Sequence, residues 1–176
     1  MSVSYIGLGS NLDHPAAQLA RAKQSLAALP STTLLAASGI YRSAALTLPG
    51  AAAQPDYLNA VIKIQTGLTP HALLDAMHAI ELAQGRQRNE RWAARSLDLD
   101  ILLYDHLQLN DPDLTVPHPG IAQRAFVLYP LQEMEPAMEI PACGKLTTLL
   151  AQLAATDRCE RLGSFDEVAG ATQQNN

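Results

Sequence analysis

The pattern of apolar and polar positions divides the first hundred or so residues into short strand-like runs and longer helix-like runs. Strand-like runs are apolar, alternating or rich in β-branched residues, and each is bounded by turn formers. Four of them are predicted as β-strands, at residues 3–8, 34–42, 57–66 and 97–104. The chain therefore offers enough strands for one sheet.

Helical spacing of apolar residues predicts helices between these strands. The first follows the turn at residues 7–11, with Asp13 as its N-cap and Pro15 in its first turn, and it ends at Pro30. The second opens at Thr69 and Pro70 and has Gly85 as its C-cap. The order strand, helix, strand, strand, helix, strand is that of an α+β ferredoxin-like (βαββαβ) fold, an antiparallel sheet with helices packed on it.

The remaining segments are predicted from weaker signals. Residues 43–55 form a loop of about a dozen residues without periodicity, and loops of that length are usually functional, so we interpret it as a lid. A C-terminal helical extension is expected at residues 117–135, broken or restarted at Pro130, and at residues 146–155. We predict one domain over residues 1–163 and a frayed polar tail over residues 164–176.

Composition narrows the class of protein. The chain has 176 residues, of which 48% are hydrophobic, which suits one domain with a real core. Neither a signal peptide nor an apolar run of about eighteen residues is recognisable, so we expect a cytoplasmic protein without membrane contact. The two cysteines, Cys143 and Cys159, lack metal-binding spacing and are expected to be reduced thiols.

Charge is concentrated in one short segment. Residues 86–95 hold four of the 12 basic residues and one acidic residue, a local charge of +3, while the remainder of the chain carries −8 to give a net charge of −5. A nucleic-acid-binding protein normally has a broad basic face, whereas this chain has a pI near 5.4. A small, highly charged ligand such as a nucleoside triphosphate fits better.

Directly after this basic segment come two aspartates, Asp98 and Asp100, spaced two residues apart on a predicted strand. Side chains at this spacing lie on one face of a strand. Mg²⁺ typically takes one or two protein carboxylates and completes its octahedron with water and phosphate oxygens, and arginines supply planar donors for phosphates. The pattern predicts a Mg²⁺-phosphate site, the alternative being a solvated acidic strand beside a salt-bridged loop.

Six fragments, in register along the chain, resemble one known family. They are residues 5–12, 55–60, 81–88, 91–92, 95–102 and 116–119 with Arg124 and Phe126. Together they resemble 6-hydroxymethyl-7,8-dihydropterin pyrophosphokinase, an enzyme family of folate synthesis, over about residues 1–160. The resemblance implies a ferredoxin-like fold, ATP as co-substrate, two Mg²⁺ ions, transfer of the terminal pyrophosphoryl group to the hydroxymethyl oxygen of the pterin, and release of AMP.

The resemblance also implies roles for individual residues. Asp98 and Asp100 are implied to be catalytic ligands of both Mg²⁺ ions, and Arg86 and Arg95 to be loop arginines that stabilise the transferring group. The implied ATP-binding residues are Glu81, Arg88, Arg91, Trp92, Ile101, Thr115, His118 and Arg124. The implied pterin-binding residues are Tyr57 and Phe126, which would stack on the ring, Asn59, which would pair with its edge, and Gly9.

Taken without the resemblance, several of these residues have a structural interpretation. An aromatic residue such as Tyr57 or Phe126 is more often part of a core. Asn59 inside a strand has poor propensity and, if it is buried, needs partners, which a ligand or the backbone can supply. His118 between two prolines has a restrained backbone, so its ring is aimed at one place.

The chain departs from the family pattern at several places. The segment between Arg88 and Arg91 is shorter than in some relatives, and Asp113 falls near where some members have a nucleotide-binding arginine. Ala93 and Ala94 stand where the family usually has Gly-Pro, and residues 43–53 replace a Pro- and Gly-containing loop that lines the pterin site. Two rival functions are a polymerase-β-like nucleotidyltransferase and a non-catalytic ferredoxin-like binding module. The first normally has its Gly-Ser about ten residues before the aspartates, but here Ser10 and Asp98 are 88 positions apart. We expect a monomer whose partners are small molecules.

Overall fold

The computed structural model describes residues 1–45, 54–85, 96–154, 157 and 159–173. Its central feature is a six-stranded antiparallel sheet, with strands in the order β10, β3, β4, β1, β5 and with β2 also paired to β4. The first part of the chain contains β1 (Ser2–Ser10), α1 (Pro15–Ala27), β2 (Thr32–Ala37), β3 (Ile40–Ser43), β4 (Tyr57–Thr66), α2 (Pro70–Ala83) and β5 (Asp98–Tyr104). This is the predicted ferredoxin-like arrangement.

The second part of the chain adds short elements and three helices. They are β6 (Leu109–Asn110), β7 (Thr115–Val116), the 3₁₀ turn η1 (Ile121–Gln123), α3 (Ala125–Met134), β8 (Glu139–Ile140), β9 (Gly144–Lys145), α4 (Leu146–Gln152), β10 (Glu160–Gly163) and α5 (Phe165–Gln173). Among the described residues, no helix is both long enough and apolar enough to span a membrane.

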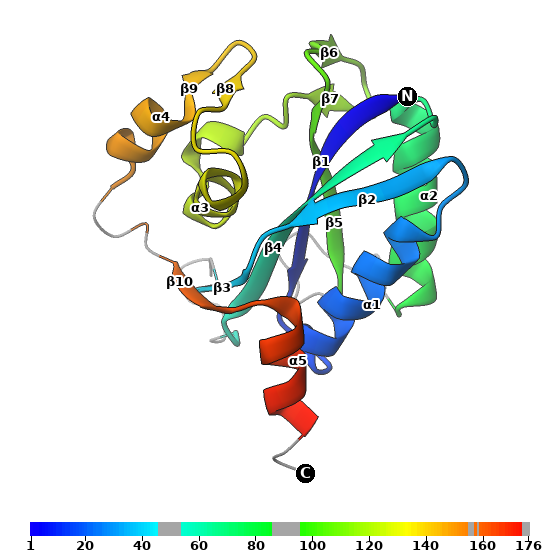
Figure 1. The fold of residues 1–176 in the computed structure, drawn as a ribbon, viewed down its shortest axis with the longest axis vertical. Helices are drawn as coiled ribbons and strands as arrows, with labels where there is room; N and C mark the ends of the chain where they lie inside the picture. Colours follow the sequence, from blue (N-terminus) through cyan, green and yellow to red (C-terminus); the bar gives the residue numbers. More distant parts are fainter. Residues whose placement is uncertain (46–53, 86–95, 155–156, 158, 174–176) are drawn as a thin grey trace.

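Helices cover both faces of the sheet (Figure 1). On one face α1 and α2 pack over Ile6, Leu8, Ile62 and Ile64. On the other face α3 and α4 pack over a second cluster that includes Val61 and Leu103. Because β1, β4 and β5 contribute side chains to both clusters, the middle of the sheet is buried on both sides, and the strands are apolar well beyond simple alternation.

The predicted strand at residues 34–42 is two strands, β2 and β3. Both pair with β4, and the chain breaks between them at Ser38 and Gly39. Ser38, at the break, is hydrogen-bonded to Val61 on the central strand β4. The Ser38 N–H donates to the Val61 carbonyl at 2.9 Å, and the Ser38 hydroxyl accepts from the Val61 N–H at 3.0 Å. Backbone groups that the interruption would leave unpaired are thereby satisfied.

Several predicted helix details differ in the structure. The C-cap of α2 is Gln84 rather than Gly85, and α4 ends at Gln152 rather than at residue 155. His14 rather than Asp13 is the N-cap of α1, with φ 61° and without a side-chain cap. The region predicted to be helical from residue 117 instead follows β7 as a turn and the 3₁₀ turn η1, and α3 starts only at Ala125, because Pro117 and Pro119 favour extended backbone before them. Helix α3 then continues through Pro130 without restarting.

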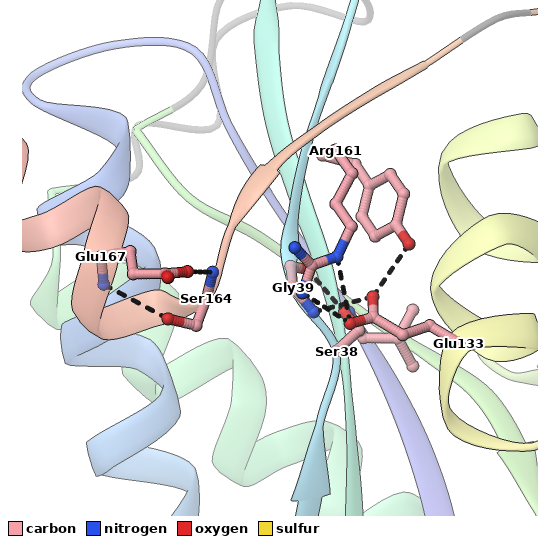
Figure 2. Close-up of polar contacts among 8 residues, drawn as sticks. Ser38, Gly39, Glu133, Arg161, Ser164 and Glu167 are labelled. Atoms are coloured by element: carbon pink, nitrogen blue, oxygen red, sulfur yellow. Dashed lines mark hydrogen bonds and ion pairs between the residues drawn. The ribbon is translucent and has the colours of Figure 1, made fainter.

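The tail predicted to be frayed forms helix α5 instead. Two local contacts start it: the Ser164 N–H donates to Glu167 Oε2 at 2.7 Å, and the Glu167 N–H donates to Ser164 Oγ at 3.3 Å (Figure 2). This reciprocal pairing is a capping box, which satisfies two donors at the start of a helix. Phe165, only 4% exposed, then buries its ring in the main core, with Lys23 Nζ 4.4 Å from the ring centroid.

The buried ring of Phe165 predicts that α5 contributes to the stability of the whole domain. Phe165→Ala should lower the free energy of unfolding by about 3 kcal/mol, the usual cost of removing a buried aromatic ring. Urea denaturation followed by circular dichroism measures this change. Leu35→Ala, at a leucine that is 47% exposed on β2, is the control and should change stability by less than about 0.5 kcal/mol. Equal effects of the two substitutions would show that α5 does not pack as described.

Candidate active site

Asp98 and Asp100 lie on β5 as predicted, with their side chains on one face of the sheet. Leu97, Leu99 and Ile101 are buried in the core beneath α1 and α2, so the two aspartates, which alternate with them, face the side covered by α3. Both are partly exposed. The sheet therefore presents two carboxylates, side by side, on a rigid element.

A row of residues crosses the sheet from Asp98. Asp98 pairs with Gly9 on β1, Gly9 pairs with Asn59 on β4, and Asn59 pairs with Tyr41 on β3. Directly opposite residues in antiparallel strands share a face. The strand pairing thus brings together residues that are far apart in the sequence, and it connects the acidic side of the site to the side predicted to bind the pterin.

Gly9 has no side chain, so the sheet surface in the middle of this row is open. A Cβ atom at residue 9 would lie 3.4 Å from Asn59 Oδ1 and 3.9 Å from Tyr57 Cδ1. A larger side chain would therefore fill the space between Asn59 and Tyr57, while glycine leaves the sheet surface open to a flat group. This geometry agrees with the predicted place of Gly9 beside the pterin.

Asn59 is held by the protein in one orientation. It is 5% exposed, and its Nδ2 donates to Ser43 Oγ at 2.8 Å and to the Tyr41 carbonyl at 3.5 Å. Protein groups therefore satisfy the Asn59 Nδ2, and these bonds also aim the Oδ1 atom toward Gly9. Sequence reasoning assigned no role to Ser43 and Tyr41, because nothing in the local pattern shows that they reach Asn59.

On the acidic side, two cationic or potentially cationic groups approach Asp100. His118 Nε2 and Arg124 Nη1 each lie 3.7 Å from Asp100 Oδ2. Arg124 stands immediately before α3, and its guanidinium carbon is 5.9 Å from the centroid of the Phe126 ring. The predicted phosphate-binding residues and one predicted pterin-stacking residue thus lie together beside the carboxylates.

His118 is fixed by one contact of its backbone and one of its ring. Its backbone N–H donates to the Leu102 carbonyl, and its ring Nδ1 accepts from the Gly120 N–H, each at 3.0 Å. Burial lowers the pKa of His118 more than the Asp100 carboxylate raises it. A lowered pKa favours the neutral ring at neutral pH, and because Nδ1 accepts a hydrogen bond, the proton lies on Nε2 and faces Asp100.

Three predicted ATP-binding residues have visible structural contacts. Glu81 is 2% exposed on α2, and its Oε1 accepts from the Leu99 N–H at 2.8 Å, which supports β5 between the two aspartates. The Ile101 side chain is in the core, which leaves only its backbone for the predicted contact with ATP. Within the β6–β7 hairpin, Thr115 Oγ1 donates to Asn110 Oδ1 at 3.3 Å.

The end of β1 anchors the two segments that flank the site. Ser10 Oγ donates to the Ser96 carbonyl at 2.5 Å, and Asn11 Nδ2 donates to the Pro55 carbonyl at 3.2 Å. These two carbonyls stand close to the starts of β5 and β4. Strand β1 continues through Ser10, where a turn at residues 7–11 was predicted. Ser10 and Asn11, at the end of β1, therefore hold the strands that carry both the aspartates and the residues predicted to bind the pterin.

Several predicted residues lie outside the described part of the chain. They are Arg86, Arg88, Arg91, Trp92 and Arg95, together with the Ala93–Ala94 departure and residues 46–53 of the predicted lid. Their assignments remain predictions from the sequence.

Comparison with known proteins decides the family. Residues 5–136 match the model of the 7,8-dihydro-6-hydroxymethylpterin-pyrophosphokinase family. The chain belongs to this family. A 2-amino-4-hydroxy-6-hydroxymethyldihydropteridine pyrophosphokinase of Pseudomonas aeruginosa is 47% identical over 147 residues, which cover 84% of this chain and 89% of that protein. A protein with the same name from Haemophilus influenzae is 44% identical over 154 residues, covering 88% and 94%.

Solved structures agree at the level of the fold. A Plasmodium falciparum HPPK-DHPS crystal structure with pterin and p-hydrobenzoate aligns with a TM-score of 0.65 at 13% identity. The alignment covers 86% of this pyrophosphokinase-family chain and 44% of the Plasmodium chain. The shared fold accounts for the antiparallel sheet with helices packed on it.

The residues of the site fit a magnesium ion bound together with phosphates. In the part of the chain that the structure describes, no group of three or more His, Cys, Asp and Glu side chains forms a metal cage. Mg²⁺ does not require one, because it keeps several waters and takes one or two carboxylates plus phosphate oxygens. Two carboxylates on one strand face, with His118 and Arg124 beside them, match that donor set.

Proposed function

We propose that this chain transfers the terminal pyrophosphoryl group of ATP to the hydroxymethyl oxygen of 6-hydroxymethyl-7,8-dihydropterin, giving AMP and the pterin diphosphate in folate biosynthesis. The row that joins Asp98 to Asn59 through Gly9 supports this proposal most strongly. It combines, on one face of one sheet, carboxylates suited to a metal nucleotide and a fixed amide suited to the edge of a flat heterocycle.

The pterin ring that the proposed site would recognise is flat and has polar edges. A bicyclic ring needs stacking on its two faces and donor and acceptor pairs along its edge. Tyr57 and Phe126 would supply the faces, and the Asn59 carboxamide the edge. Since Ser43 and Tyr41 already fix the Asn59 amide, little side-chain entropy is lost when the ring binds.

The nucleotide side would carry two Mg²⁺ ions held by Asp98 and Asp100. When bound, Mg²⁺ neutralises phosphate charge and aligns the attacking and leaving oxygens. Arg124 and His118, both next to Asp100, would hold phosphate oxygens, with His118 donating from Nε2. From the sequence resemblance, Arg86 and Arg95 would add positive charge over the transferring group.

The proposed reaction asks for positioning more than for acid–base chemistry. The hydroxymethyl oxygen forms a bond to the β-phosphorus, the bond from that phosphorus to the α,β-bridging oxygen breaks, and AMP leaves with the electron pair. The hydroxyl proton passes to a phosphate oxygen or to water. Phosphoryl-type transfer depends mainly on alignment and on stabilising charge, which is what a rigid row of residues provides.

The described part of the site comes from a single chain, so we propose that a monomer is sufficient for activity. Asp100, His118, Arg124 and Asn59 all belong to the same sheet or to segments packed on it. With ATP and a pterin as substrates, we further propose a cytoplasmic enzyme without a nucleic-acid or membrane partner.

Product analysis separates this function from its rivals. The protein is incubated with ATP, Mg²⁺ and 6-hydroxymethyl-7,8-dihydropterin, and the nucleotides are separated by chromatography. A pyrophosphokinase releases AMP in step with pterin consumption, whereas a nucleotidyltransferase releases pyrophosphate and a binding module leaves ATP intact. Accumulation of pyrophosphate without AMP, or unchanged ATP, would exclude the proposed function.

A further inference from the structure

A polar cluster around Glu133 lies at the β3–β10 edge of the sheet, whereas the aspartates lie on β5 at the opposite edge. Glu133, on α3, accepts four hydrogen bonds with its carboxylate (Figure 2). Oε2 accepts from the Gly39 N–H at 3.0 Å and from the Tyr41 hydroxyl at 2.8 Å. Oε1 accepts from Arg161 Nε at 3.2 Å and Nη2 at 2.8 Å. One carboxylate thus joins α3, β3 and β10.

The guanidinium of Arg161 lies directly against the backbone at Gly39. A Cβ atom at Gly39 would lie 2.8 Å from Arg161 Nε, so a larger residue there would displace the guanidinium from this stretch of backbone. Burial alone would raise the pKa of Glu133, but the bonds from Arg161, Gly39 and Tyr41 outweigh burial and hold that pKa below its usual value. The carboxylate is therefore charged at neutral pH.

This cluster continues the row that crosses the candidate site. Arg161 on β10 pairs with Tyr41 on β3, and Tyr41 pairs with Asn59. The row consequently runs from the C-terminal strand to Asp98, with all its members on the face covered by α3. Glu133 bonds two of them, Arg161 and Tyr41, and the backbone of Gly39 just before β3.

Strand β3 is the direct support of Asn59. The Tyr41 carbonyl and the Ser43 hydroxyl, both on β3, accept from the Asn59 amide. Past Ser43 the chain enters the loop, and on the other side β3 pairs only with the four-residue strand β10 among the described strands. Strand β3 has only four residues, so the contacts of its side chains contribute to its position. Because the Asn59 amide donates to two groups of β3, a shift of β3 would turn the Asn59 carboxamide.

We propose that Glu133 is a positioning residue for the pterin side of the site, acting with Arg161 through Tyr41 and strand β3 to set the orientation of Asn59. This inference rests on the proposed function, because it assigns Asn59 to pterin recognition. It gives the C-terminal strand, which lies outside the residues matched by the family model, a part in substrate binding. It predicts that the cluster affects pterin affinity and leaves ATP affinity unchanged.

The matched control is another carboxylate near the same helix end. Glu135, the C-cap of α3, pairs with Lys63 and lies near Tyr5, toward the middle of the sheet. Its removal breaks an ion pair of comparable exposure, yet that pair does not touch β3. Glu135→Ala should therefore reproduce any general effect of losing a carboxylate from this region without turning Asn59.

The test measures dissociation constants of the pterin and of Mg²⁺-ATP separately, in the full chain. Glu133→Ala should raise the pterin constant by about 10-fold, the low end of what outer-layer partners of a site contribute, and change the ATP constant by less than about twofold. Glu133→Gln should raise the pterin dissociation constant less than Glu133→Ala does, since its amide oxygen still accepts from Gly39 and Tyr41. The pterin dissociation constant of Arg161→Ala should lie between those of the two Glu133 variants. Glu135→Ala should leave the dissociation constants of both ligands within about twofold of the wild type.

Two outcomes would overturn the inference: a pterin constant unchanged in Glu133→Ala, or pterin and ATP constants raised by the same factor, as a merely structural role would give. Should Glu133→Ala fail to fold, Glu133→Gln and Arg161→Ala carry the same comparison, because each keeps part of the cluster. Wild-type turnover is measured in parallel. If the wild type produced no AMP, the proposed function would be wrong. If the wild type turned over normally but the variants changed pterin and ATP affinity equally or not at all, only the proposed role of Glu133 would be wrong.

Discussion

Asp98→Asn and Asp100→Asn are each expected to lower turnover by on the order of 100-fold or more, with the fold intact. The substitution keeps the size of the side chain but removes one negative charge from the strand face that would hold the metal nucleotide. Because both side chains are partly exposed and point away from the core, circular dichroism and the unfolding midpoint should change little. Steady-state rates at saturating Mg²⁺ and ATP measure the effect.

Asp166→Asn is the control for this pair. Asp166 is an exposed aspartate in the first turn of α5, so its variant loses the same charge away from the site. Its rate should match that of the wild type. Near-normal turnover of both Asp98→Asn and Asp100→Asn would contradict the assignment of these residues to the metal nucleotide.

Arg86→Ala and Arg95→Ala are expected to lower turnover by roughly 10² to 10⁵, the range in which an arginine aimed at a transferring phosphoryl group acts. Both residues lie outside the described part of the chain, and the prediction rests on their position in the motif before Asp98. An interaction made only in the transition state lowers the rate while ATP affinity changes less. Single-turnover rates and ATP dissociation constants separate the two quantities.

Arg21→Ala, at an exposed position on α1, controls for the loss of one positive charge. If the whole deficit of Arg86→Ala and Arg95→Ala appeared in ATP affinity, with the single-turnover rate at saturation unchanged, both residues would be ATP-binding groups without a role in the transition state.

Much of the site was predictable because its signals are local. The alternation of residues 97–104 placed Asp98 and Asp100 on one strand face, since period-two patterning over a strand has only one consistent register. Thr69 was expected to open a helix, and its hydroxyl accepts from the Ala72 N–H at 3.3 Å at the start of α2. In both cases a few neighbouring residues contain the whole physical reason.

The support of the site was not predictable because its contacts are long-range. Glu133 reaches Tyr41 across 92 positions of the chain, and Ser10 reaches Ser96 across 86. Neither contact leaves a periodic signal in one sequence. The capping box of α5 is a different case: Ser164 and Glu167 stand at the right spacing, but the polar sequence that follows them conceals the helix.

The sequence predicts one continuous strand at residues 34–42, whereas the structure has a break between β2 and β3. Both halves pair with β4, so the sequence retains strand-like composition on each side of Ser38 and Gly39. The Arg161 guanidinium, held by Glu133, lies where a Cβ atom at residue 39 would be. A feature set by packing from another part of the chain appears locally as an unexplained small residue.

The position of isotopic label shows directly whether this chain transfers a pyrophosphoryl group. ATP labelled with ³²P at the β or at the γ phosphate is incubated with 6-hydroxymethyl-7,8-dihydropterin and Mg²⁺, and the pterin product and the nucleotide product are separated and counted. We expect both labels to enter the pterin product in equal yield and the nucleotide product to be unlabelled AMP. Transfer of the γ label alone, with the β label retained in ADP, would contradict pyrophosphoryl transfer.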